Sequence, residues 1–80
     1  MENYEEIYNV LSEREREYVL ATTKQERERI ESSVRGYANN LPRSVYAELN
    51  EGYGSGLFEH GFFESDMGRC LRVLEQKVRE

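Results

Sequence analysis

Eighty residues suffice for one small domain, residues 1–80, but a chain of this length buries only a thin core. Charged residues make up 34% of the chain and the net charge is −5. This net negative charge argues against a protein whose main task is to bind phosphates, because lysine and arginine provide most of that binding. A single cysteine excludes an internal disulfide, and no apolar run is long enough to span a membrane, so we expect a cytoplasmic protein.

The first helical pattern runs from about residue 3 to residue 22. Its apolar residues recur at spacings of three and four, on one face: Tyr4, Ile7, Tyr8 and Leu11. Residues 12–17 are then wholly polar, and Ser12 with Glu15 fits a capping box, where a new helix can start. One long helix and two short helices both agree with this segment.

Residues 11–20, Leu-Ser-Glu-Arg-Glu-Arg-Glu-Tyr-Val-Leu, resemble the opening of LuxR-type helix-turn-helix domains, whose first helix often begins Leu-Thr/Ser-x-Arg-Glu. The resemblance covers ten of the eighty residues. It departs at Tyr18, an extra residue before the Val-Leu pair, and residues 24–30 stand where the turn and the recognition helix are expected. What the resemblance implies is an alternative function, a small DNA-binding regulator; no DNA-contacting residue is assigned.

A second helix is predicted to follow Thr23, which forms a capping box with Glu26. Residues 24–29 are polar throughout, so we expect this half of the helix to be solvated on all sides. The later half carries an apolar stripe: Ile30, Val34, Tyr37 and Leu41. The helix is expected to end at the Asn39-Asn40 pair, since Pro42 disfavours helix in the residue before it.

Pro42 suits the first position of a third helix, for which Gly52 is the predicted stop. A fourth helix is expected after the glycine-rich stretch, capped by Ser65 or Asp66. Its apolar stripe is Met67, Cys70, Leu71, Leu74 and Val78. We expect Met67, Leu71 and Leu74 to face Ile30 and Val34 in the core, with Cys70 as a small buried hydrophobe.

No residue pattern predicts an enzyme, a cofactor or a metal site. The glycines at 52, 54 and 56 are spaced G-x-G-x-G, which differs from the G-x-G-x-x-G of dinucleotide loops. Zinc needs about four ligands, and His60 with Cys70 cannot supply them. His60 is expected to be a loop residue.

The predicted fold is all-α, a compact bundle of three to five short helices with one glycine- and aromatic-rich irregular loop at about residues 52–63. Two interpretations of this loop stay open: it folds back and plugs the bundle, or its aromatic residues form a contact patch. On the second, the partner-binding residues are an apolar centre with an acidic rim: Tyr53, Leu57, Phe58, Phe62, Glu48, Glu51, Glu59 and Glu64.

The predicted function is a non-catalytic protein-binding module, of the kind with which viruses and mobile elements inhibit or redirect a host protein. The expected partner is another protein with a basic surface, for example a nucleic-acid enzyme, because acidic faces complement such surfaces. A nucleic-acid or membrane partner is not expected. The thin core also leaves room for a homodimer and for a third function, a self-assembling helical structural protein.

Overall fold

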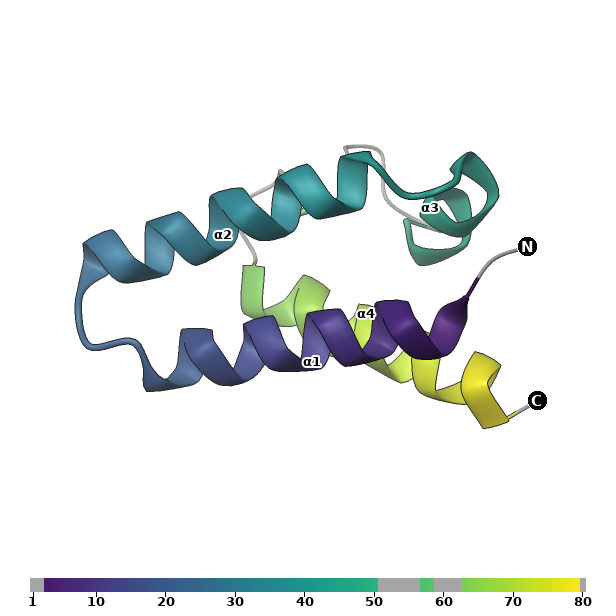
Figure 1. Ribbon diagram of the computed structural model, residues 1–80, viewed down its shortest axis with the longest axis horizontal. Coiled ribbons are helices and arrows are strands. Elements are labelled where there is room, and N and C mark those ends of the chain that lie inside the picture. Colours follow the sequence, from purple (N-terminus) through teal and green to yellow (C-terminus); the bar gives the residue numbers. More distant parts are fainter. Residues whose placement is uncertain (1–2, 51–56, 59–62, 80) are drawn as a thin grey trace.

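A computed structural model describes residues 3–50, 57–58 and 63–79, and within these ranges it contains four helices and no strand. The long helices α1 (Tyr4–Leu20) and α2 (Lys24–Asn39) form an antiparallel hairpin, and α4 (Phe63–Arg79) crosses α1 (Figure 1). The short helix α3 (Arg43–Leu49) lies at the opposite end from the α1–α2 turn (Figure 1). The predicted all-α bundle is confirmed.

The N-terminal segment forms one helix rather than two. Asn3 caps α1, its side-chain oxygen accepting a hydrogen bond from the backbone N–H of Glu6 at 3.0 Å. The helix then continues through Ser12, so the Ser12–Glu15 box starts no new helix. Glutamate and arginine favour helix, and Arg14 pairs with Glu17 at 2.8 Å. A polar run therefore extends the helix instead of breaking it.

The cap predicted at Thr23 is confirmed, because its hydroxyl accepts a hydrogen bond from the backbone N–H of Glu26 at 3.1 Å. The helix α2 ends at Asn39, with Asn40 as its C-cap, as expected. Pro42 proves to be the N-cap of α3 and not its first residue. The helix α3 stops at Leu49 with Asn50 as C-cap, and Gly52 lies outside the described residues.

The helix α4 begins at Phe63, before the predicted caps Ser65 and Asp66. Packing explains this earlier start. The Phe63 side chain is buried, and its ring contacts the rings of Tyr18 and Phe58, with centroids 4.7 and 5.4 Å apart. Asp66 therefore lies within the first turn of α4 and is fully buried.

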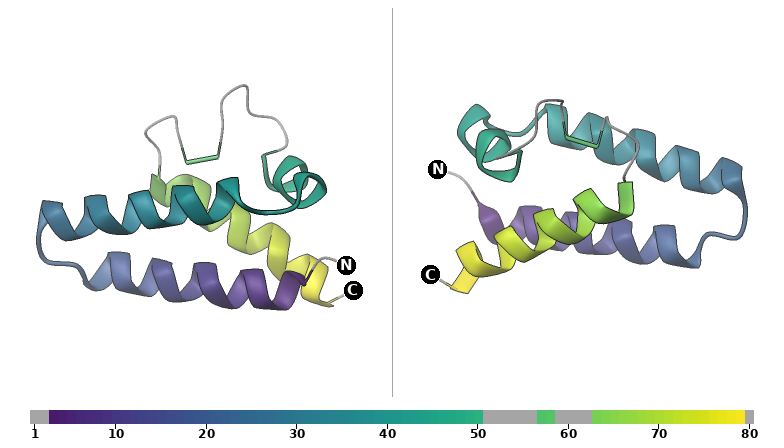
Figure 2. Two further views of the ribbon diagram at one scale, coloured as in Figure 1. Left: turned by 45° about the horizontal axis from the view of Figure 1, so that its top comes forward. Right: turned by 180° about the vertical axis from the view of Figure 1, so that it is seen from behind.

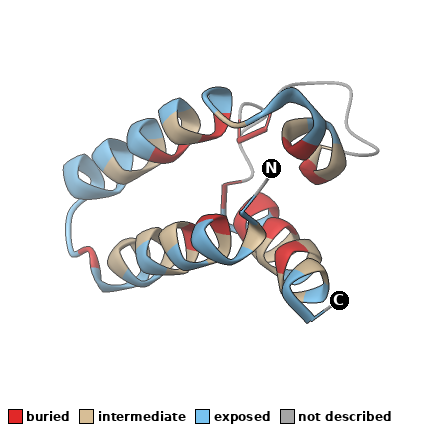
Figure 3. Cartoon of the chain, turned by 45° about the vertical axis from the view of Figure 1, so that its right-hand side comes forward, coloured by how far each residue is buried: buried red, intermediate tan, exposed pale blue. Residues whose placement is uncertain are grey.

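One hydrophobic cluster joins all four helices and residues 57–58, and Figure 3 shows its buried residues on the facing sides of the elements. Met67, Leu74 and Val34 belong to it, as predicted, and so does Cys70. Leu71 and Ile30 do not; both are only partly buried and pack against its edge. Ile30 lines a hollow between α1 and α2 together with Leu20 and Ala21.

The end of the α1–α2 hairpin projects beyond the rest of the bundle. The two further views agree that neither α3 nor α4 reaches the turn between α1 and α2 (Figure 2). Residues 22–29 are all exposed, which confirms the solvated first half of α2. The folded chain thus has a packed body and a solvated hairpin end.

Leu74 should be essential to the core. Its side chain is 0% exposed, so Leu74→Ala is expected to lower the free energy of unfolding by about 2–5 kcal/mol, measured by urea denaturation. Leu71→Ala is the matched control, because Leu71 lies on the same helix and is only partly buried. Equal losses in the two variants would contradict this core.

Cys70 should act only through packing and burial. Burial raises the pKa of its thiol from the ordinary 9.0 to about 11. Between these pH values the folded chain keeps a proton that the unfolded chain releases, so raising the pH favours unfolding. The wild-type protein should therefore lose stability from about pH 9 to about pH 11 relative to Cys70→Ala, measured by urea denaturation at each pH. Parallel pH profiles for the two proteins would contradict this.

Candidate functional site

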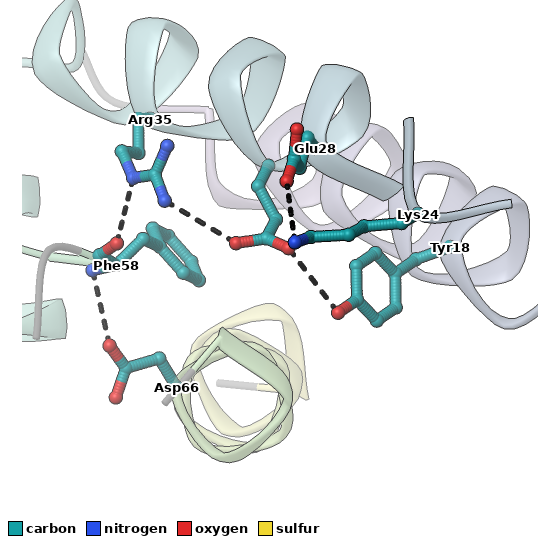
Figure 4. A network of polar contacts seen from close by, with 7 residues as sticks. Tyr18, Lys24, Glu28, Arg35, Phe58 and Asp66 are labelled. Atoms are coloured by element: carbon teal, nitrogen blue, oxygen red, sulfur yellow. Dashed lines mark hydrogen bonds and ion pairs between the residues drawn. The ribbon is translucent and has the colours of Figure 1, made fainter. Parts of the chain in front are cut away.

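Residues 57 and 58 are held among the helices by hydrogen bonds from three sides. The Phe58 backbone N–H donates to Asp66 Oδ2 at 3.1 Å, and the Phe58 carbonyl accepts from Arg35 Nε at 2.9 Å (Figure 4). The Leu57 N–H donates to the Tyr46 hydroxyl at 2.8 Å. Side chains from α2, α3 and α4 thus form hydrogen bonds with these backbone N–H and C=O groups. Burying the same groups without a partner would cost free energy.

The same network reaches α1 through Glu31. Arg35 pairs with Glu31 at 3.3 Å, and the Tyr18 hydroxyl donates to the other Glu31 oxygen at 3.4 Å (Figure 4). Desolvation by burial and the negative charges of Glu31 and Glu64 raise the pKa of Tyr18. Tyr18 therefore stays a neutral donor at physiological pH.

Phe58 has a φ of 63°, in the left-handed region that side chains rarely adopt. Such a conformation costs on the order of 1–3 kcal/mol and persists only where its surroundings impose it. Here the two backbone hydrogen bonds and a side chain only 2% exposed impose it. Phe58 is a structural anchor.

The structure corrects the contact role predicted for Leu57 and Phe58. Their side chains are 1% and 2% exposed, so neither is available to a partner, and these two residues plug the bundle. Glu48 is also engaged within the chain: its Oε2 accepts from the Tyr4 hydroxyl at 3.2 Å and pairs with Lys77 at 3.5 Å. Glu48 therefore joins α3 to α1 and α4.

Of the other predicted contact residues, only Glu64 is described. It is exposed in the first turn of α4. The remaining ones lie outside the described residues, as does His60: Glu51, Tyr53, Glu59 and Phe62. Phe63, placed in the irregular loop by its sequence, belongs to α4. Half of the predicted patch thus lies outside the described residues.

The exposed apolar surface lies instead at the end of α1. Val19 and Leu20 are 72% and 70% exposed, against 42% for Val78, the third large apolar side chain exposed in the described ranges. Residues 18–21 are apolar without a break, and successive helical residues point about 100° apart. The side chains of Tyr18, Val19 and Leu20, the last three residues of α1, cannot all face one core, so the sequence indicates that part of this run is uncovered but not which residues.

Two hollows flank this pair. Val19 lines a groove of about 120 Å³ between α1 and α4, here named the α1–α4 groove, formed by Glu15, Tyr18, Val19, Phe63, Glu64 and Met67. Leu20 lines a wider hollow of about 680 Å³, named the hairpin cleft, formed by Glu17, Leu20, Ala21, Thr23, Gln25, Glu26, Arg29 and Ile30. Apolar side chains and charges of both signs thus meet at the hairpin end.

Within residues 3–50, 57–58 and 63–79, no three His, Cys, Asp or Glu side chains come together as a metal would need. No described helix is both long and apolar enough to cross a bilayer. No protein-family model, curated protein or solved structure matches the chain.

Phe58→Ala should unfold the protein rather than weaken a contact. Removing this buried ring is expected to cost about 3–5 kcal/mol, enough to lower the melting temperature sharply in so small a domain. Phe58→Leu keeps more of the buried volume and should lose clearly less. A Phe58→Ala variant with an unchanged thermal melt by circular dichroism would show that the ring is not part of the core.

Proposed function

We propose that this chain is a non-catalytic protein-binding module that contacts its partner through the end of the α1–α2 hairpin. The observation that carries the proposal is the adjacent pair Val19 and Leu20, at 72% and 70% exposed. Single exposed apolar residues are common on protein surfaces. Two neighbours that each line a hollow, at a projecting end of the bundle, are typical of a contact surface.

The free energy of burial favours Val19 and Leu20 as contact residues over Leu57 and Phe58, which are already buried in the core. Fully burying one such side chain yields about 1.5–3 kcal/mol, which the isolated chain forgoes at both positions. The charged side chains that line the hairpin cleft with Leu20 are Glu17, Glu26 and Arg29, which give the apolar pair a charged rim. An apolar centre with a polar rim is the common plan of protein interfaces.

The partner class that we favour is a cytoplasmic host protein with a basic surface, such as a nucleic-acid enzyme that this chain inhibits. The support is the net charge of −5, which attracts a basic surface over long range. On this proposal the chain is a small inhibitor or adaptor of the kind that viruses and mobile elements encode.

Replacing the pair should weaken binding strongly and leave the fold intact. The double variant Val19→Ser, Leu20→Ser is used as bait in a host lysate beside the wild type and beside Val78→Ser, an exposed control on α4. Proteins captured by the wild type and Val78→Ser but not by the double variant are purified, and their affinity is measured by calorimetry. We expect the double variant to lose about 2 kcal/mol or more of binding free energy.

The thermal melt of the double variant should stay close to that of the wild type, because exposed substitutions usually change stability by about 0.5 kcal/mol or less. A double variant that stays folded and captures the same proteins as the wild type would refute the hairpin end as the binding surface.

A further inference from the structure

We propose that the α1–α4 groove binds a long cationic side chain, lysine or arginine, presented by the protein partner. This inference rests on the proposed function and adds to it the chemistry of one contact. It concerns the groove beside Val19 and not the hairpin cleft beside Leu20.

The groove has the size and the walls for one aliphatic stem. Its volume of about 120 Å³ suits a single long side chain. Apolar side chains form most of its wall: Tyr18, Val19, Phe63 and Met67. Phe63 and Met67 are buried core residues, so the core itself forms the floor of the groove. The methylene stem of a lysine or an arginine packs well on such a wall.

Both charged residues that line the groove are negative. Its two charged lining residues are Glu15, from α1, and Glu64, from α4. Neither takes part in an ion pair with any residue that the structure describes. The charge of Glu64 contributes to raising the pKa of Tyr18, whereas the charge of Arg27 lowers it. A cation at the end of an apolar stem would meet both carboxylates.

The hairpin cleft does not favour a cationic side chain over an anionic one. It is lined by Glu17 and Glu26 together with Arg29, so it carries charges of both signs. A purely apolar side chain would fill the α1–α4 groove but leave Glu15 and Glu64 without a counter-charge. The groove therefore selects its occupant by two independent features, an apolar stem and a positive end.

The test uses three synthetic peptides that differ only in their central residue, which is arginine, norleucine or glutamate within Gly-Ser-Leu-X-Leu-Ser-Gly. Each is titrated to millimolar concentration into the ¹⁵N-labelled full chain at low salt and followed by NMR. We expect the arginine peptide to bind about tenfold more tightly than the norleucine peptide, and the glutamate peptide to bind most weakly. The largest shifts should lie at the amides of Val19, Phe63 and Glu64.

Charge reversal in the groove should reverse this order. The variant Glu15→Lys, Glu64→Lys is expected to prefer the glutamate peptide. The matched control is Glu13→Lys, Glu28→Lys, which changes the net charge equally at exposed positions that do not line the groove. The control should keep the wild-type order, with both variants shown to be folded by circular dichroism.

The inference fails if the three peptides bind with equal affinity or if none of them shifts the NMR signals of the chain. It also fails if the shifts centre on the hairpin cleft, or if the control variant reverses the order of peptide affinities as the groove variant does. A concentration-dependent dimer in light scattering that Glu15→Lys, Glu64→Lys abolishes would identify a second copy of this chain as the occupant instead. If capture of a partner needs Val19 and Leu20 while the peptides show no charge preference, the proposed function stands and this inference fails. If instead the peptides show the expected charge preference while capture of a partner does not need Val19 and Leu20, the hairpin end is refuted as the binding surface and the inference about the groove stands.

Discussion

The structure depends on the docking of Phe58 between α2 and α4. Both of these helices pack mainly against α1, and Phe58 connects them directly (Figure 4). Its N–H bonds to Asp66 on α4, its carbonyl bonds to Arg35 on α2, and its ring lies in the core. An 80-residue chain has few core residues, so one buried aromatic ring and two satisfied backbone groups weigh heavily. The left-handed backbone at Phe58 is the local cost of this arrangement.

The position of this anchor determines what the bundle leaves uncovered. With Phe58 docked and Phe63 packed on Tyr18, α4 starts beside the C-terminal part of α1 and runs away from the hairpin turn (Figure 2). Nothing in the described part of the chain then covers Val19 and Leu20. The packing that completes the core thus also creates the apolar hairpin end and the groove beside it.

The candidate surface that the described residues offer lies at the hairpin end. Aromatic residues near glycines are typical of a contact loop, yet Leu57 and Phe58 serve the core. Glu64 is the predicted contact residue that keeps a place in the candidate surface, because it borders the α1–α4 groove. The acidic character expected of the contact persists there, carried by Glu15 and Glu64, from two different helices.

The sequence by itself determined the helices and much of the core, because these follow from local rules. Spacings of three and four placed Met67, Leu74 and Val34 on buried faces, and Thr23 capped α2 as its capping box predicts. Only the tertiary structure decided that the side chains of Leu57 and Phe58 are buried in the core and that Val19 and Leu20 are exposed. An apolar residue gains the same free energy from a core as from a partner, so composition alone does not separate the two. What separates them here is whether α4 reaches the residue, and that depends on contacts between segments far apart in the chain.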